Sequence, residues 1–179
     1  KNPSEAIVYY TKSINVNMKQ HEAFHARGVL YGGLREWGKA LSDLSAALRQ
    51  KVHDPDILVA RGKIFLALEQ FEKASGDFSD AILVAAQNDG AFLGRAESNF
   101  SLGKYDRCIT DLLKAKELSM KLSTNQKALL VNAYVKYAGQ LFDLGKYAAV
   151  LENIDHALEN DPEVLQSTKE LQTESNYQL

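Results

Sequence analysis

One short segment of the sequence carries the residue types of a zinc peptidase. His21, Glu22 and His25 form the pattern H-E-x-x-H, in which two histidines at i and i+4 bind zinc from one helix face and the glutamate acts as a base. Catalytic zinc needs a third protein ligand, and the other histidines, His53 and His156, are expected on a loop and on a distant helix. Phe24 inside the segment and Gly28 three residues after it also belong to a repeat that runs along the chain. We therefore predict no metal site, no cofactor and no enzymatic activity.

Other residues that could do chemistry are few. Cys108 is the single cysteine, so no internal disulfide can form, and its place in the repeat is that of a small core residue. The 21 lysines and arginines nearly balance 23 aspartates and glutamates, and a net charge of −2 argues against nucleic acid as a partner. No apolar run approaches the roughly 20 residues that span a bilayer. A cytoplasmic location is expected, with the ER lumen or a cilium as alternatives.

Landmark residues recur every 34 positions along the chain. Within each period, apolar residues at helical spacing stand on both sides of a short break, which predicts a helix, a tight turn and a second, antiparallel helix. A period of this length indicates stacked copies of one unit and not a single globular core. The series include Gly28, Gly62 and Ala96; Trp37, Phe71 and Tyr105; Leu44, Phe78 and Leu112; and Ala47, Ala81 and Ala115.

This arrangement resembles the tetratricopeptide repeat (TPR), which has small and large apolar residues at fixed places on two helices. Copies cover residues 21–54, 55–88, 89–122 and 131–164. The resemblance implies an all-α fold, a right-handed superhelical solenoid of antiparallel helix hairpins, forming one domain over residues 1–179. It also implies a concave groove, lined by the first helix of each hairpin, in which peptides or helices of partner proteins bind.

The repeat is interrupted at three places. Eight extra residues precede the fourth copy, at about 123–130, and are expected to lengthen the neighbouring helices by about two turns. Residues 1–20 align only with a second helix, which suggests a truncated repeat with an exposed apolar face and a fragment of a longer solenoid. Residues 165–179 are mostly polar and are expected to form a capping helix.

Three pairs of opposite charges follow the same period. An arginine precedes the small residue of each first helix, and an aspartate comes 16 residues later. The fourth copy has Tyr137 and Asn153 instead, so both charges are lost together. This paired loss favours a structural ion pair within each hairpin over a row of arginines that grips an acidic ligand. The pairs are Arg27 and Asp43, Arg61 and Asp77, and Arg95 and Asp111.

The resemblance also assigns residues to the groove. Many groove positions are glycine or alanine and the charges are few and mixed, which suits an apolar or amphipathic partner segment. Alternatively, the small residues only permit tight curvature and bind nothing. The candidate partner-binding residues are Glu22, His25, Val29, Asp56, Val59, Lys63, Leu93, Glu97, Phe100, Asn132, Val135, Lys136 and Phe142.

We therefore predict a non-enzymatic scaffold or adaptor that binds a partner protein in the groove. The alternatives are a co-chaperone that holds unfolded clients, similar to J-domain proteins with TPR arrays, and a structural segment of a large assembly such as a ciliary array. Binding of Hsp70 or Hsp90 C-terminal tails is not expected, because the positions of the family's carboxylate clamp do not carry the lysine, asparagine and arginine residues in the places where the clamp has them. In the first frame these positions are His25, Val29, Ala60, Gly90 and Gly94; in the second they are Val59, Lys63, Gly94, Asn132 and Lys136, of which only Lys136 matches.

Overall fold

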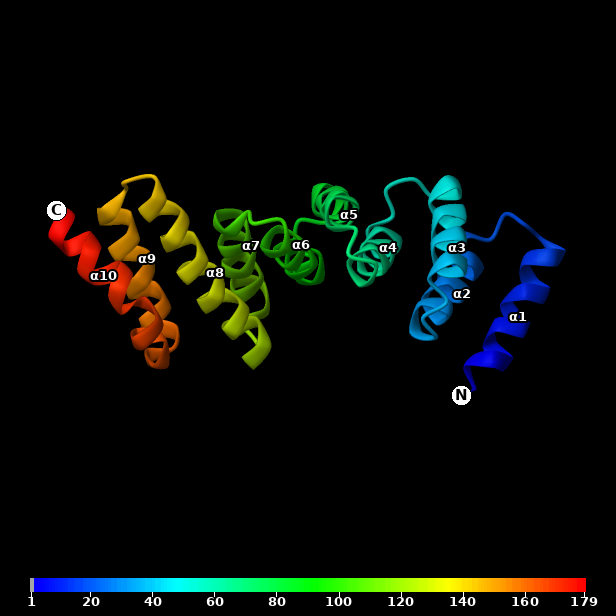
Figure 1. The fold of residues 1–179 in the computed structure, drawn as a ribbon. Coiled ribbons are helices and arrows are strands. Elements are labelled where there is room, and N and C mark those ends of the chain that lie inside the picture. Colours follow the sequence, from blue (N-terminus) through cyan, green and yellow to red (C-terminus); the bar gives the residue numbers. More distant parts are fainter. Residues whose placement is uncertain (1) are drawn as a thin grey trace. The chain divides into compact units, whose positions relative to one another are not determined.

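The computed structural model describes residues 2–179 (Figure 1). Within that range the chain forms α-helices, one short 3-10 helix and no strand, and no helix there is long and apolar enough to cross a membrane. The elements are α1 (Pro3–Val16), α2 (His21–Gly33), α3 (Trp37–Gln50), α4 (Pro55–Ala67), α5 (Phe71–Val84), α6 (Asp89–Ser101), α7 (Tyr105–Ser119), α8 (Thr124–Asp143), α9 (Tyr147–Asn160), η1 (Pro162–Val164) and α10 (Leu165–Gln178).

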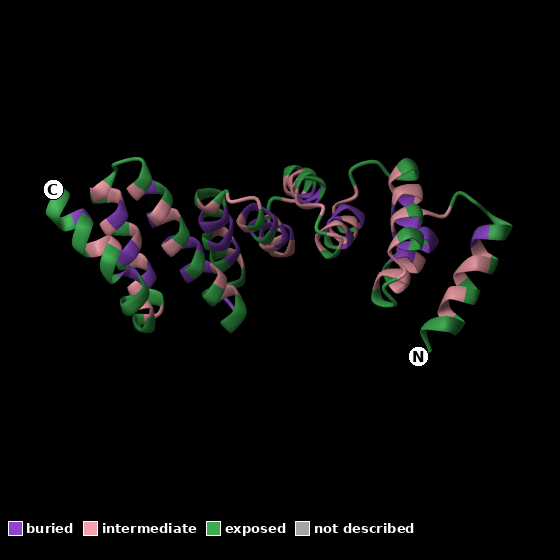
Figure 2. Cartoon of the chain, viewed as in Figure 1, coloured by how far each residue is buried: buried purple, intermediate pink, exposed green. Residues whose placement is uncertain are grey.

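The chain divides into two compact units, Lys1–Ser98 and Asn99–Leu179. The boundary falls inside α6, so the first unit holds α1 to α5 and most of α6, and the second holds α7 to α10. Each unit buries its own set of apolar side chains, on the inner sides of its helices (Figure 2). The assignment of one domain to the whole chain stays a prediction.

In the first unit, α2 pairs with α3 and α4 pairs with α5. The first turn closes where the backbone amide of Glu36 donates to the carbonyl oxygen of Tyr31 at 2.9 Å, and Gln70 makes the same bond to Phe65 at 2.8 Å. These bonds satisfy carbonyl groups that the helix ends leave open. Two clusters of buried residues, which also include one residue each from α1 and α6, form the core of this unit: Ile14, Ala23, Phe24, Ala40, Leu44, Ala47, Ile57 and Ile64, and then Leu58, Ala74, Phe78, Ala81 and Ala91.

Glycines set how closely the two helices of each hairpin approach. A Cβ atom on Gly28 would lie 2.9 Å from Cγ of Leu44, and one on Gly62 would lie 2.9 Å from the ring of Phe78. Both distances are shorter than a side chain tolerates, so α2 can pack on α3, and α4 on α5, only without a side chain at these positions.

In the second unit, α8 pairs with α9, and α7 packs against α8. The α8 helix has 20 residues against 13 in α4, and α7 has 15 against 14 in α5, so the eight extra residues of this repeat lie in longer helices. Ser123 and Gln126 form a capping box at the start of α8, because each side chain bonds the other residue's backbone amide.

The last helix, α10, packs against α9 and α8 through small polar side chains. Thr168 and Ser175 are fully buried, although both are polar. The hydroxyl of Thr168 donates to the carbonyl oxygen of Val164 at 3.1 Å, whereas the Ser175 hydroxyl has no hydrogen-bond partner. Leu171 is the apolar contact of α10 with the core of this unit, which is formed by Ala138, Leu141, Val150 and Ile154.

The first helix, α1, presents an exposed apolar side. Asn2 caps it by accepting from the Ser4 amide at 3.1 Å. Ile14 is buried toward α2, but Val8 and Tyr9 are 54% and 69% exposed. These two side chains are large and apolar, as the sequence suggested for this segment. Lys1, with which the predicted truncated repeat begins, lies outside the described residues.

Candidate functional site

Arg27 and Arg61 each hold the aspartate of their own hairpin with two hydrogen bonds. Arg27 donates from Nε to Oδ2 of Asp43 at 2.7 Å and from Nη2 to Oδ1 at 2.8 Å. Arg61 makes the same two bonds to Asp77, at 2.8 and 2.7 Å. These bonds raise the pKa of both guanidinium groups, while burial opposes their charge. The two arginines therefore serve the scaffold and are engaged before any acidic ligand arrives.

Each arginine also reaches the second helix of the preceding repeat. Nη1 of Arg27 donates to the hydroxyl of Thr11 at 2.9 Å, and Nη1 of Arg61 donates to that of Ser45 at 3.4 Å. These hydroxyl groups were not among the predicted residues, although Thr11, Ser45 and Ser79 are themselves 34 residues apart. Arg27 and Arg61 thus join consecutive repeats as well as the two helices of one hairpin.

The third repeat has an arginine, an aspartate and a serine at the same positions, but a neighbouring aromatic residue is replaced by asparagine. Nη1 of Arg95 donates to Ser79 at 3.3 Å, and buried Asp111 accepts a hydrogen bond from Nδ2 of Asn99 at 3.1 Å. Asn99 stands where the two preceding repeats have an aromatic residue. The departure therefore places an amide donor next to a buried carboxylate, which lowers the cost of burying it.

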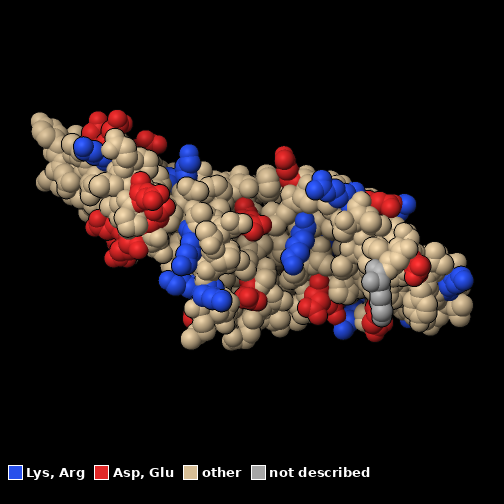
Figure 3. All heavy atoms as spheres, turned by 90° about the horizontal axis from the view of Figure 1, so that it is seen from below, with Lys and Arg blue, Asp and Glu red and all other residues tan. Residues whose placement is uncertain are grey.

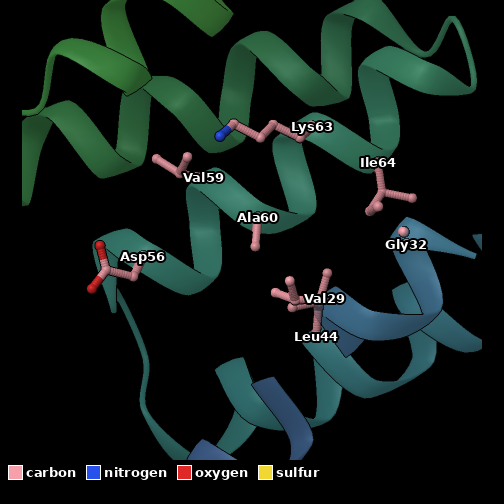
Figure 4. A pocket seen from close by; sticks show the side chains of 9 residues that line it. Val29, Gly32, Leu44, Asp56, Val59, Ala60, Lys63 and Ile64 are labelled. Carbon is pink, nitrogen blue, oxygen red and sulfur yellow. The ribbon is translucent and has the colours of Figure 1, made fainter. Parts of the chain in front are cut away.

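A pocket of about 380 Å³ opens between α2 and α4 in the first unit (Figure 4). Most of its lining is apolar, and Asp56 and Lys63 stand at its rim. Val29 is 48% exposed beside it, whereas Leu44 is fully buried at its base. Apolar concave sites with a few polar groups at the edge are typical of ligand pockets. The lining residues are Val29, Gly32, Gly33, Leu44, Asp56, Val59, Ala60, Lys63 and Ile64.

Comparisons with known proteins connect this geometry to one fold. No protein-family model matches the sequence, and no curated protein is significantly similar to it. Among solved structures, YrrB, described as a TPR protein with an unusual peptide-binding site, matches 93% of this chain and 84% of its own at a TM-score of 0.69 and 17% identity. The chain has the tetratricopeptide-repeat fold.

Two further TPR structures match a smaller part of the chain. The TPR domain of Arabidopsis OM64 covers 65% of this chain and 96% of its own, at a TM-score of 0.61 and 24% identity. The first TPR of Spaghetti (RPAP3), solved with the HSP90 peptide SRMEEVD, covers 63% of this chain and 89% of its own, at 0.61 and 17%. The structural similarity establishes the TPR fold. At identities this low it does not indicate which partner this chain binds.

The groove residues predicted in the first unit, residues 2–98, include two groups that line different hollows. Val29, Asp56, Val59 and Lys63 line the α2–α4 pocket. Glu22 instead lines a separate hollow of about 340 Å³ that also involves α1. The sequence analysis left out Gly32, Leu44 and Ile64 as lining residues, because a buried core leucine gives no sequence signal that one side of it faces a pocket.

Three further predicted residues of this unit do not line the pocket. His25 and Leu93 are half-buried and Glu97 is exposed at its surface. Desolvation raises the pKa of the Glu97 carboxyl, and the positive charge of Lys63 opposes that rise. Gly94, which the clamp alignment placed in the groove, is buried against Phe78, since a Cβ atom there would lie 2.6 Å from Cε2 of that ring.

In the second TPR unit, the predicted groove aromatics contact other parts of the scaffold. The rings of Phe100 and Tyr105 pack edge to face with centroids 5.3 Å apart, and Phe142 and Tyr147 do the same at 5.5 Å. Phe142 also lines a hollow together with residues of α10. The remaining predicted residues of this unit are half-buried Val135 and exposed Asn132 and Lys136.

The peptidase-like segment is an ordinary part of the first TPR hairpin. Nε2 of His21 lies 3.1 Å from a carboxylate oxygen of its neighbour Glu22, and Phe24 between the two histidines is a buried core residue. Among the described residues, no three histidine, cysteine or acidic side chains come together as a metal site. Cys108 is fully buried in α7.

Charges of both signs are mixed on the surface. Figure 3 shows lysine and arginine groups interspersed with carboxylates on one face. On the face that Figure 3 shows, the described lysines and arginines form no extended positive stripe of the kind that tracks a phosphate backbone.

Proposed function

We propose that this chain is a non-enzymatic scaffold that binds a segment of a partner protein along the first helices of its repeats. The pocket between α2 and α4 carries the proposal, because it combines an apolar interior with charged groups only at the rim. Exposed Val29 and the neighbouring Val59 lose contact with water when a segment covers them, which favours association. Two structures with the same fold, YrrB and RPAP3, are described with a peptide-binding site or a bound peptide, which supports the proposal.

We further propose that the partner is not an acidic C-terminal tail of the Hsp70 or Hsp90 type. In the first unit, the positions that would hold the terminal carboxylate carry His25, Val29, Ala60, Gly90 and Gly94. A carboxylate needs fixed cationic or amide donors when water is excluded, and these residues supply none at neutral pH beyond one imidazole. The peptide SRMEEVD is therefore expected not to bind at micromolar concentration.

A selection from a random peptide library tests the proposal. The purified chain is expected to enrich a family of related sequences, with binding measured by fluorescence polarisation. Val59→Asp is expected to abolish that binding because it puts a carboxylate into the apolar pocket. Leu83→Asp is the matched control, because Leu83 is 84% exposed on α5 and does not line the pocket.

Three outcomes contradict the proposal. Selection may yield no related sequences, Leu83→Asp may weaken binding as much as Val59→Asp does, or both variants may bind as the native chain does. A client-holding co-chaperone is distinguished by a different result: it suppresses aggregation of an unrelated unfolded protein while enriching no sequence family.

A further inference from the structure

We propose that the pocket between α2 and α4 is an anchor site for one large apolar side chain of the partner segment. The charged residues at the pocket rim set the direction of that segment, with a partner carboxylate toward Lys63 and a partner cation toward Asp56. This inference rests on the proposed function and adds which residues of the partner are recognised and where.

The pocket has its shape because two of its lining residues, buried Leu44 and half-buried Ala60, differ from the residues 34 positions later. The repeat places Phe78 at the position of Leu44 and Gly94 at that of Ala60. Phe78 is fully buried, and its ring extends as far as Gly94, where there is no room even for a Cβ atom. Leu44 has no ring, and both Leu44 and Ala60 line the open pocket.

A third difference widens the opening beside α2. Gly32 stands where the next repeat has Leu66, which packs against the core of its hairpin. Ile64 occupies part of the space beside Gly32, since a Cβ atom on this glycine would lie 2.7 Å from Cδ1 of Ile64. The residual pocket of about 380 Å³ lies near the lower end of the roughly 300–1,000 Å³ range of ligand pockets. It therefore suits one side chain and not a whole helix face.

The rim charges are placed to orient an occupant. Asp56 is in the first turn of α4 and Lys63 comes seven residues later, about 10 Å along the helix axis. Figure 4 shows Asp56 at the start of α4 and the Lys63 side chain farther along it, with its ammonium beside Val59, while Ala60 points toward Val29. Asp56 and Lys63 are both exposed, so they can pair with a partner. Charges at an interface rim contribute to orientation and specificity more than to affinity.

The decisive variant copies the packing that the neighbouring repeat already uses. Leu44→Phe combined with Ala60→Gly reproduces Phe78 and Gly94, so the new ring fills the pocket without the overlap that Ala60 would cause. We expect the double variant to fold with a far-ultraviolet circular dichroism spectrum like that of the native chain. Binding of the selected peptides is expected to weaken roughly 10- to 100-fold, which is the effect of no longer burying one large apolar side chain.

The peptide side provides a check that does not depend on the stability of the double variant. Replacing the anchor residue of a selected peptide with glycine is expected to weaken binding to the native chain by a similar factor. The glycine-substituted peptide is expected to bind the native chain and the double variant equally, because the change in the peptide and the change in the protein remove the same contact. Lys63→Glu is expected to weaken native-peptide binding and to favour a peptide whose carboxylate is replaced by lysine. Lys12→Glu, an equal charge change on the exposed side of α1, serves as its control.

The results separate this inference from the proposed function. Loss of binding in Val59→Asp with unchanged binding in the double variant keeps the scaffold and overturns the anchor pocket. Equal weakening by Lys63→Glu and Lys12→Glu overturns the assigned direction. Failure to select any peptide family overturns both proposals.

Discussion

Replacing Gly94 with alanine should destabilise the chain, although alanine is the better helix former. Gly94 is in α6 and is buried against Phe78. A methyl group there would come within 2.6 Å of Cε2 of a ring that is itself fully buried. The ring also packs against Gly62 of α4, where a Cβ atom would lie 2.9 Å from it, so it has little room to move in that direction.

The size of the effect follows from two opposing contributions. A change from glycine to alanine in a helix interior stabilises by about 0.5–1 kcal/mol. Overpacking a dense core costs about 1–3 kcal/mol. The net loss for Gly94→Ala is therefore about 1 kcal/mol, within a range of about 0–2.5 kcal/mol. Gly76→Ala is expected to bring only the gain in helix propensity. Gly76 is in the middle of α5, and a Cβ atom there would have no atom of a neighbouring element within 4 Å. This control should gain about 0.5–1 kcal/mol.

Urea unfolding followed by circular dichroism measures both variants against the native chain. The pair Gly94→Ala with Phe78→Leu then completes a double-mutant cycle, because leucine and alanine already coexist as Leu44 and Ala60. In the Phe78→Leu background, Gly94→Ala should no longer cost stability. The reasoning is wrong if Gly94→Ala stabilises as Gly76→Ala does, or if its cost is the same with phenylalanine and with leucine at position 78.

Three other changes test different parts of the scaffold. Asp77→Ala leaves the partly buried Arg61 guanidinium without its carboxylate and should cost about 3 kcal/mol in urea unfolding, whereas Glu117→Ala, which breaks an exposed pair with Lys114, should cost less than about 0.5 kcal/mol. Ser175→Ala removes a buried hydroxyl that has no partner and should stabilise the second unit by about 1 kcal/mol, seen as slower amide exchange in α10. Burial disfavours the Asp54 carboxylate, but bonds from Lys51 and from the amides of Ile57 and Asp56 outweigh it and hold the pKa of Asp54 below its ordinary value. Its stabilisation is therefore present at neutral pH and is lost as pH falls through the lowered value, so Asp54→Asn should flatten stability against pH in that acidic range.

The repeat made most of the fold predictable. Copies with the same small and large residues must form the same hairpin, because each small residue permits one close approach and each large one fills one gap. The spacing of 16 residues was enough to bring Arg27 to Asp43 and Arg61 to Asp77, since a hairpin of two 13- or 14-residue helices returns the chain to the same level. The serine and threonine acceptors were equally periodic, but a lone hydroxyl gives no signal without a donor placed next to it.

The candidate site was less predictable, and the reason is physical. Alignment to a repeat assigns each residue the average surroundings of its position, whereas a pocket depends on the sizes of several neighbours taken together. Gly94 aligns with Ala60, yet the first is packed under a ring and the second faces an opening. The difference comes from Phe78 and Leu44, which are on other helices.

Function in such a chain is therefore expected where copies differ and not where they agree. The landmarks that repeat are the residues that the scaffold needs in every hairpin, so a partner cannot use them to distinguish one repeat from another. Gly32, Leu44 and Ala60 break the pattern of the following repeat at buried or half-buried positions and together line an opening. A partner that recognises this opening would be held at one repeat along the array, and a variant that restores the pattern would release it while leaving the fold intact.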